Sequence, residues 1–541
     1  MNSLYFMSFL SALGLSMALI PMLIKYSARL GLVDDPDGSD RKLHRGVMPR
    51  SGGLGIVLAT VLALVLVLPL DRELLSFLAA SVIIIAFGVW DDRDDLRPAV
   101  KLFGQGLGVA VAMAGGMGIS DVPVVHDMPG WLCAGLTFIF VLAVINAVNF
   151  SDGMDGLAAG TSLMALVLIF ALAVEAGDVA VATIALAVSA GVLGFLRFNT
   201  HPARIFMGDA GSQFLGFAIA WLAIVMSQRD TTPMTTFMPL LVLGIPIMDL
   251  LQVIPLRLSQ GRMPWQPDRQ NFHHQVAGLG LQQHEAVALI YLMQAVLLAA
   301  AWLLRYATDG TVLGVYVLYA GVIIGAIYCA RLNGWQLRDA VTATGPQRRN
   351  PFFRRISGLH RYTGKFFGMA VTLFLGAAAL ATDTFTPPLL FAALSWAGVL
   401  ALILVFSRNR WPLALGRLAT YTATACLVYG LTRSLESELL NAAIDGALII
   451  MALLLMVAIR ITRRAYFWLT TQDLLVLLFI VILVPQIPQL FSESFATDSL
   501  VFRTCVTLYT CEYLLARGDS ARYRLTLASI CTLALLGVHL A

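Results

Sequence analysis

Residues 131–157 read WLCAGLTFIFVLAVINAVNFSDGMDGL, an apolar run that ends in a cluster of acidic and amide side chains. The apolar part is long enough to cross a hydrocarbon core of roughly 30 Å as a helix. Lipid offers no partners to backbone N–H and C=O groups, so a spanning segment must be helical or part of a closed barrel. This stretch therefore predicts a membrane helix that ends in polar residues.

The composition extends this prediction to the whole chain. Of 541 residues, 59% are hydrophobic and 13% are charged, whereas soluble domains are about half apolar and a quarter charged. Apolar runs of about 17 to 25 residues recur about 18 times. We predict an all-α polytopic membrane protein with helices centred near residues 15, 61, 82, 110, 140, 166, 188, 220, 246, 295, 321, 375, 398, 422, 451, 481, 508 and 532. The first helix should be retained, because no small-residue cleavage signal follows it.

Polar loops between these segments hold nearly all the notable Asp, Asn, Lys and His residues. They lie at 34–51, 91–101, 146–156, 197–212 and 260–275. Alternating the segments across the membrane places all of these loops on one side. Basic residues in short loops favour the cytoplasm, and the first loop is basic. We therefore expect one shared site that faces the cytoplasm.

The remaining composition excludes other classes of partner. Membrane topology and contact with anionic lipid explain the basic loops and the net charge of +4, so no nucleic-acid partner is expected. The six cysteines lie singly and form no CxxC pair. We interpret them as packing residues rather than disulfides or metal ligands.

The chain divides into three predicted parts. Residues 1–331 hold about eleven apolar segments and every acidic or histidine motif; 332–365 form a basic cytoplasmic linker; 366–541 hold about seven further segments without a motif. The chemistry is assigned to the first part. The C-terminal membrane domain has no assigned role. Two interpretations of it stay open: packing or partner docking, and recruitment of a lipid carrier or of a downstream enzyme.

The acidic motifs indicate cation and ligand binding. Asp91 and Asp92 are adjacent, and neighbouring carboxylates repel unless a cation or a basic group such as Lys101 lies between them. A solvated helix end is the other interpretation. In NAVNFSDGMDGL, residues 146, 149, 152 and 155 recur at a spacing of three, which would point them to one side of a helical turn. A helix cap would explain one of them but not all.

Two later motifs complete the set. Asp209 lies between glycines at the start of an apolar segment, which suits either an N-cap or an Asp that reaches a metal ion or phosphate at a helix N-terminus. Arg269, His273 and His274 offer cationic or hydrogen-bonding groups. Such a collection at a membrane surface suits a reaction between a soluble phosphate substrate and a lipid phosphate. Bringing two anions together calls for a divalent cation. An all-oxygen site favours Mg²⁺, with Mn²⁺ as the alternative, over zinc.

Residues 1–331 resemble the polyprenyl-phosphate N-acetylhexosamine-1-phosphate transferase superfamily, glycosyltransferase family 4, of the WecA type. The resemblance rests on DDP…RKLH…PRSGG at 34–53, DDRDDLRPAVK at 91–101, NAVNFSDGMDGL at 146–157, NTHPARIFMGDAGS at 199–212 and PDRQNFHH at 267–274. It implies transfer of a sugar 1-phosphate from a UDP-aminosugar to undecaprenyl phosphate, release of UMP, and a Mg²⁺-dependent site on the cytoplasmic face of a bacterial inner membrane. Such a product would start a cell-envelope polysaccharide such as the O-antigen of lipopolysaccharide. The partners expected with it are membrane lipid and downstream glycosyltransferases, with homodimerisation left open.

The same resemblance implies roles for individual residues. It implies that Asp209 is the metal ligand and that Asp91 and Asp92 bind the metal or the lipid phosphate, one of them as a base. His273 and His274 complete the expected catalytic set. The implied substrate-binding residues are Lys42, His44, Lys101, Asn149, Asp152, Asp155, Asn199, Phe206 and Arg269. A lipid phosphate is already mostly dianionic at neutral pH, so we favour direct in-line attack, with Asp92 positioning it or accepting a residual proton.

The fifth motif bears on the sugar. PDRQ followed by two histidines resembles enzymes that take UDP-N-acetylhexosamines, and UDP-GlcNAc is the favoured donor. Asn271 stands where that pattern has His and cannot become cationic, so GalNAc or a deoxy-aminosugar stays open. A transporter would place its charges near the bilayer midplane, unlike the acids here. A non-catalytic membrane scaffold is the remaining alternative.

Overall fold

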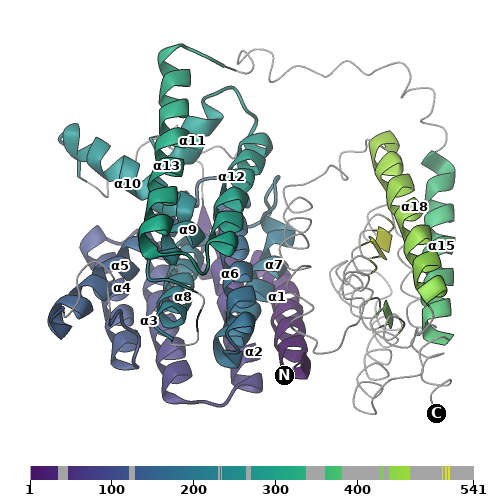
Figure 1. Ribbon diagram of the computed structural model, residues 1–541, viewed down its shortest axis with the longest axis horizontal. Helices are drawn as coiled ribbons and strands as arrows, with labels where there is room; N and C mark the ends of the chain where they lie inside the picture. Colours follow the sequence, from purple (N-terminus) through teal and green to yellow (C-terminus); the bar gives the residue numbers. More distant parts are fainter. Residues whose placement is uncertain are drawn as a thin grey trace. The chain divides into compact units, whose positions relative to one another are not determined.

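The computed structural model describes residues 2–34, 47–120, 128–229, 232, 234–263, 270–336, 360–380 and 438–462, and the single positions 424, 427, 428, 431, 503, 506, 507, 510, 511 and 514. The described residues form two compact units. The helices up to α13 belong to the first, and α15 and α18 belong to the second (Figure 1). Nearly all the regular structure is helical, which confirms the all-α prediction.

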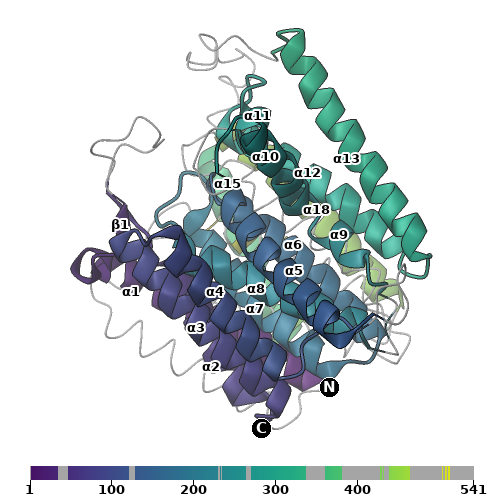
Figure 2. The same ribbon diagram turned by 90° about the vertical axis from the view of Figure 1, so that its left-hand side faces the viewer.

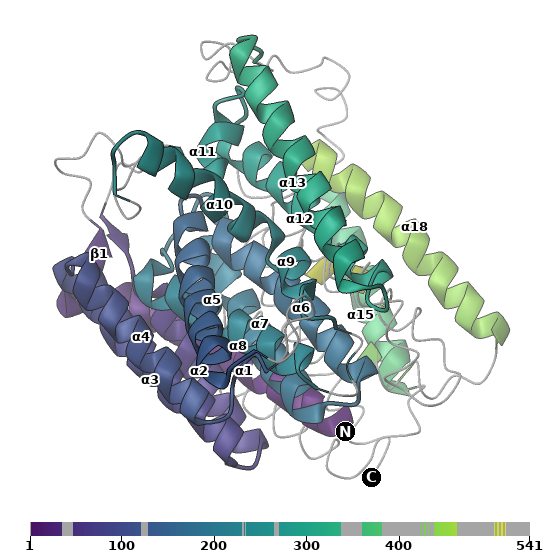
Figure 3. The ribbon, with the colours of Figure 1, turned by 60° about the vertical axis from the view of Figure 1, so that its left-hand side comes forward.

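The first unit is a layered helical bundle. Its helices are α1 (Asn2–Leu30), α2 (Gly52–Val67), α3 (Arg72–Asp94), α4 (Pro98–Ala114), α5 (Gly130–Ser151), α6 (Leu157–Glu175), α7 (Val179–Asn199), α8 (Gly208–Ser227), α9 (Met238–Val242), α10 (Gly244–Ser259), α11 (Phe272–Ala277), α12 (Gln283–Leu303) and α13 (Asp309–Leu332). α6, α7 and α8 are almost wholly buried, whereas α13 is largely exposed. α1 and α2 pack against α7, α3 and α5 pack against α8, and α12 packs against α6 (Figures 2 and 3).

Among the described residues, eight helices are long and apolar enough to cross a membrane: α1, α3, α5, α6, α7, α8, α12 and α13. α2 and α4 are shorter apolar helices. Every predicted centre from residue 15 to residue 321 falls within a helix. The centres at 375 and 451 fall in α15 and α18, and the other C-terminal centres lie outside the described residues.

One predicted segment, near residue 246, is broken into two helices. Pro246 has no N–H to donate to the Val242 carbonyl four residues earlier. The Gln294 side chain on α12 fills both gaps, since its Nε2 donates to the Val242 oxygen at 2.8 Å and its Oε1 accepts from the Ile245 N–H at 3.1 Å. The sequence pattern missed the break because a residue on another helix satisfies it.

The PRSGG stretch at 49–53 joins the start of α2 to the start of α8. The Gly52 N–H donates to the Phe206 oxygen at 3.0 Å, and the Gly53 N–H donates to the Met207 oxygen at 2.8 Å. A Cβ added to Gly53 would lie 2.2 Å from the Gly211 nitrogen, so this approach requires glycine. The hairpin of β1 (Val33–Asp34) and β2 (Met48–Pro49) leads into the same stretch.

Ion pairs close the opposite end of the bundle. Arg229, after α8, contacts Glu73 at 2.9 Å and Asp178 at 3.2 Å. Arg305, after α12, lies 3.1 Å from Glu175. These acids lie at the start of α3, before α7 and at the end of α6, far along each helix from the polar motifs. Each of these three acids therefore pairs with an arginine that follows another helix.

The second unit is described by α15 (His360–Leu380), α18 (Glu438–Thr462) and the single positions. Arg503 is fully buried, and its Nε lies 2.6 Å from Asp445 Oδ1 while Nη2 donates to Asn441 Oδ1 at 2.8 Å. A buried guanidinium of this kind needs such partners, because an unpaired one would be strongly destabilising. The predicted domain boundaries, the basic linker and the role of this part stay predictions.

Replacing Gly53 by alanine should destabilise the protein, because the added methyl group overlaps the Gly211 backbone. Overpacking of this kind costs about 1–3 kcal/mol. We expect a lower thermal unfolding midpoint for the purified full chain. Gly314→Ala in α13 is the matched control, because a Cβ there meets nothing within 4 Å. Equal midpoints for the two variants would contradict the close approach.

Candidate functional site

Four helices bring polar side chains to one end of the first unit. Lys101 of α4 places its Nζ 2.9 Å from Asp91 Oδ2 of α3 and 2.8 Å from Asp209 Oδ2 of α8. Asn149 of α5 donates to the other Asp209 oxygen. Two carboxylates from distant parts of the chain therefore converge on one point, which the Lys101 ammonium occupies.

The DDRDDLRPAVK stretch folds locally to make this contact. α3 ends where Asp95 adopts a left-handed conformation, φ 46°, and Asp91 Oδ1 accepts from the Leu96 N–H at 2.8 Å. Pro98 then begins α4, a position that suits its missing N–H. The reversal brings Lys101 of the next helix back over Asp91.

Asp92 fastens the start of α8. Its Oδ1 accepts from the Asp209 N–H at 2.7 Å, and its Oδ2 accepts from the Ala210 N–H at 3.0 Å. These are N–H groups that an N-cap side chain normally binds, and the Met207 side chain makes no such bond. Gly208 has φ +73°, and a Cβ there would lie 2.6 Å from Asp92 Oδ2. In this structure Asp92 thus positions Asp209; its expected role as base or ligand stays a prediction.

Asn149 and Asn146 diverge despite their spacing of three. Asn149 Nδ2 donates to Asp209 and to Ser212 Oγ, the latter at 2.8 Å. Asn146 Nδ2 donates to Gln105 Oε1 on α4 at 2.9 Å, which holds it away from the carboxylates. The spacing therefore identified one site amide and one helix-packing amide.

Asp155 and Asn199 tie two loops together. Asp155 Oδ2 lies 2.8 Å from His201 Nδ1. Asn199 Oδ1 accepts from the Gly156 N–H, and its Nδ2 donates to the Ile205 oxygen, both at 2.9 Å. Backbone groups thus engage both ends of the Asn199 amide. Its implied contact with a nucleotide stays a prediction.

Asp152 lies just beyond the end of α5 at Ser151. Burial, together with the charges of Asp209 and Asp155, raises the pKa of its carboxyl to about 7, while Arg50 opposes this shift. Burial is the largest cause, and the two neighbouring carboxylates add to it. These carboxylates also make the region acidic, which would favour a bound cation.

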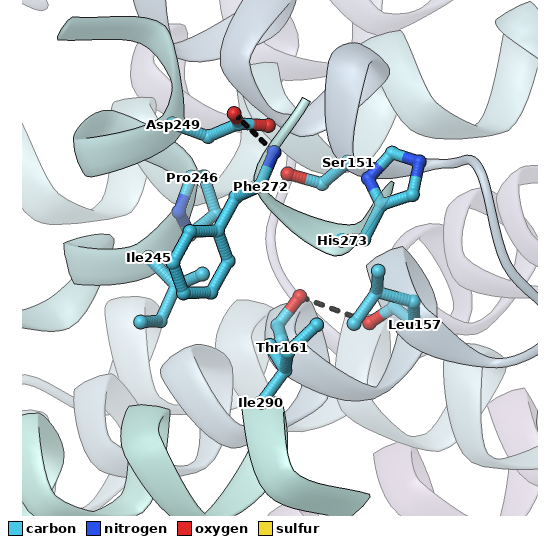
Figure 4. A pocket seen from close by; sticks show the side chains of 9 residues that line it. All are labelled: Ser151, Leu157, Thr161, Ile245, Pro246, Asp249, Phe272, His273 and Ile290. Atoms are coloured by element: carbon cyan, nitrogen blue, oxygen red, sulfur yellow. Dashed lines mark hydrogen bonds between the residues drawn. The ribbon is translucent and has the colours of Figure 1, made fainter. Parts of the chain in front are cut away.

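His273 faces the same turn from α11. A Cβ added to Gly153 would lie 2.1 Å from His273 Nε2, so only glycine allows this approach. Nε2 is buried and has no hydrogen-bond partner among the described residues. Burial and the adjacent His274 lower the His273 pKa to about 3, so the imidazole is neutral near pH 7. Beside it lies a pocket lined by Ser151, Leu157, Thr161, Ile245, Pro246, Asp249, Phe272 and Ile290 (Figure 4).

Three buried polar residues hold α11 in place. Asp249 of α10 accepts from the Phe272 N–H at 2.7 Å. The Arg257 guanidinium lies 5.2 Å from the Phe150 ring centroid and donates to Asn271 Oδ1 at 3.1 Å. Asn271 Nδ2 in turn donates to the Phe150 oxygen at 2.9 Å. A neutral amide suits this place, because it accepts from a cation and donates to a carbonyl at once.

Sequence reasoning missed Asp249 and Arg257. Their signal was a lone ionisable residue inside or at the end of an apolar run, which is rare without a purpose. Lys42, His44 and Arg269 lie outside the described residues. The Phe206 backbone joins β2 to α2, and its ring is half-buried; stacking on uracil stays a prediction.

The described residues gather no group of three His, Cys, Asp or Glu side chains around a single metal position. They do bring the Asp91 and Asp209 carboxylates to one point. Mg²⁺ usually takes one or two carboxylates and completes its shell with water and substrate phosphates. Two carboxylates therefore suit Mg²⁺ or Mn²⁺. They are too few for a metal whose ligands all come from protein side chains.

Acid should destabilise the protein partly through His273. In the unfolded chain this imidazole has its ordinary pKa of 6.5, so it binds a proton below that pH. In the folded chain its pKa is about 3, so it binds a proton only near pH 3. The contribution of the neutral His273 to stability is thus fully present above pH 6.5 and is lost as the pH drops toward 3. Unfolding midpoints from pH 7 to 4.5 should fall less for His273→Gln than for the parent. Identical slopes would contradict a buried neutral imidazole.

Asn271→Ala should lower stability by about 1.5–3 kcal/mol, because a hydrogen bond from a charged group is lost. Arg257→Met removes the other partner. If the two residues interact as described, the double variant should lose less than the sum of the single variants. Denaturant unfolding of all four proteins measures the coupling. Strict additivity would show that the contact contributes nothing.

The sequence of this chain is similar to those of known proteins. The model of glycosyl transferase family 4 matches residues 74–227. The probable undecaprenyl-phosphate N-acetylglucosaminyl 1-phosphate transferase of Bacillus subtilis (strain 168) is 34% identical over 307 residues, which cover 56% of this chain and 85% of that protein. The undecaprenyl-phosphate alpha-N-acetylglucosaminyl 1-phosphate transferase of Yersinia pestis is 30% identical over 292 residues, with 52% and 79% covered. That of Escherichia coli (strain K12) is 29% identical over 291 residues, with 52% and 79% covered.

The similarity covers most of each relative and about half of this chain. It includes α3 to α8, which carry Asp91, Asp92, Lys101, Asn149 and Asp209. The chain has several helices long and apolar enough to cross a membrane, and its relatives are transferases. It is therefore a multi-pass membrane enzyme. It belongs to glycosyl transferase family 4.

Proposed function

We propose that this enzyme transfers N-acetylglucosamine 1-phosphate from UDP-N-acetylglucosamine to undecaprenyl phosphate and releases UMP. The observation that carries the proposal is the meeting of Asp91, Asp209 and Lys101 at one point, with Asn149 oriented onto Asp209. The names of the three relatives support the lipid acceptor and the transferred group.

The reaction exchanges one phosphorus–oxygen bond for another. An oxygen of the lipid phosphate attacks the donor phosphorus that carries the sugar. The bond from that phosphorus to the bridging oxygen breaks, and UMP leaves with the oxygen and its electron pair. The lipid phosphate has a second pKa of about 6, so it is largely dianionic at pH 7 and needs no strong base. The main barrier is repulsion between two anions.

The basic and acidic residues of the site would reduce the repulsion between the two anionic substrates. Lys101 supplies a positive charge between the two carboxylates, and Asn149 fixes the rotation of Asp209. Asp92 fixes the start of α8, from which Asp209 projects. Asp91 and Asp209 would hold Mg²⁺, with Mn²⁺ as the alternative. The metal, when bound, would neutralise charge that develops on the phosphates.

His273 is the proposed contact for the sugar. A neutral imidazole donates from one nitrogen and accepts at the other, which suits sugar hydroxyl and amide groups. Its Nε2 has no hydrogen-bond partner among the described residues. UDP-N-acetylglucosamine is the proposed donor, and other UDP-aminosugars are competitors for the assay.

The wider setting is part of the proposal. The polar motifs meet at the bundle end that the basic loops would place in the cytoplasm, where UDP-sugars are made. We infer a bacterial inner membrane and a product that begins a cell-envelope polysaccharide. The acids lie at helix ends rather than along a central path, which favours the enzyme over a transporter.

The test is UMP release by the purified full chain in nanodiscs with undecaprenyl phosphate and Mg²⁺. We expect UMP with UDP-N-acetylglucosamine, and less with UDP-N-acetylgalactosamine or UDP-glucose. Asp209→Asn should lower kcat by about 10²–10³, the size of effect seen when one electrostatic group is removed from an active site. Its folding is checked by thermal unfolding.

Asp94→Asn is the matched control, since this acid is the last residue of α3, the helix that carries Asp91 and Asp92, and its side chain is 54% exposed. It should retain parental UMP release. If the parent releases no UMP with any UDP-sugar offered, the scaffold alternative holds instead.

A further inference from the structure

Arg50 is a cation at the site that the reaction scheme has not used. Asp91, Asp92, Asp152, Asp155 and Asp209 make the region acidic, and both substrates of the proposed reaction are anions. The Lys101 ammonium already contacts two of these carboxylates. The Arg50 guanidinium, from the PRSGG stretch, interacts electrostatically with Asp92 and Asp152 from another side.

The chain fixes Arg50 at both its backbone and its side chain. The Arg50 N–H donates to the Leu32 oxygen at 3.0 Å. A Cβ on Gly208 would lie 2.5 Å from the Arg50 oxygen, so this backbone abuts the start of α8. Nη2 donates to Asp34 Oδ1 at 2.8 Å, and Asp34 is 7% exposed. Asp34 thereby aims the guanidinium.

Most N–H donors of the Arg50 guanidinium have no hydrogen-bond partner among the described residues. A guanidinium carries five N–H donors in a planar fork that matches phosphate oxygens two at a time. Among the described residues, Asp34 is the hydrogen-bond partner of this guanidinium, through a single nitrogen. The side chain is 29% exposed, so a soluble or lipid headgroup can reach it. A purely structural role in the hairpin would not require the Arg50 backbone and the Asp92 carboxylate to approach the same glycine, Gly208.

The helix N-terminus beside Arg50 does not compete for this role. The N–H groups of Gly52 and Gly53 already donate to the Phe206 and Met207 carbonyls. An anion arriving here would therefore find its donors on the Arg50 side chain rather than on the α2 backbone.

We propose that Arg50 binds a phosphate group of a substrate, with Asp34 as its positioning residue. This inference rests on the proposed transferase function. The chemistry is shared by the lipid phosphate and by the donor diphosphate, and both lie within one reaction. Steady-state kinetics with each substrate varied in turn distinguishes them.

The experiment compares Arg50→Gln and Arg50→Lys with the parent in nanodiscs, by UMP release. Arg50→Gln should raise KM for one substrate about ten- to hundredfold, as expected for loss of a charged hydrogen bond. Arg50→Lys should raise the same KM less, because an ammonium keeps the charge but not the fork. Asp34→Asn should shift the same KM in the same direction. A rise for undecaprenyl phosphate identifies the acceptor phosphate; a rise for UDP-N-acetylglucosamine identifies the donor.

Arg97→Gln is the matched control, because this exposed arginine lies at the start of α4 near the same site. It reports the effect of losing one surface charge, and both KM values should stay parental. If Arg50→Gln unfolds at lower temperature, Arg50→Lys, which keeps the pair with Asp34, carries the test. Unchanged KM values for both substrates in an active Arg50→Lys and Arg50→Gln overturn this inference alone. An inactive parent overturns the proposed function instead.

Discussion

The site depends on the contact between the Asp92 carboxylate and the first turn of α8. Both carboxylate oxygens accept backbone N–H groups there, and the side chain is 6% exposed. Burying a carboxylate is unfavourable, but two hydrogen bonds and the positive end of the helix dipole offset this. The Met207 side chain makes no bond of this kind at the start of α8. Asp92 therefore fixes the turn from which Asp209 projects, and Asn149 and Lys101 then hold the Asp209 carboxylate.

Small residues make this contact sterically feasible. A Cβ on Gly88 would lie 2.5 Å from the Ala210 Cα, and one on Gly211 would lie 2.6 Å from the Gly53 Cα. α2, α3 and α8 thus meet backbone to backbone beneath the carboxylates. These glycines bring three helices together. The close packing of these helices therefore also sets the positions of the carboxylates that they carry.

The sequence predicted the helices and the meeting of the acidic motifs because both follow from simple rules. Apolar length gives helices, and alternation across a membrane gives a shared side. It could not predict that Asn146 turns to Gln105, since both amides of α5 obey the same spacing. Nor could it predict the break before Pro246, which depends on Gln294 from α12. The buried bridge from Arg257 through Asn271 to Phe150 likewise joins segments more than 100 residues apart.

The two ends of the bundle differ in how their charges are balanced. At the far end, Glu73, Asp178 and Glu175 each have an arginine close by, so little net charge remains. Ion pairs near a surface contribute little stability, but here each of these carboxylates has a basic partner. At the site, the acids outnumber Lys101 and Arg50, and burial together with the charges of Asp209 and Asp155 raises the pKa of Asp152 to about 7. Such an imbalance is unfavourable by itself, and a bound cation would relieve it. The same excess would repel a phosphate that came alone, so the proposed reaction of two anionic substrates would call for a bound cation besides Lys101 and Arg50.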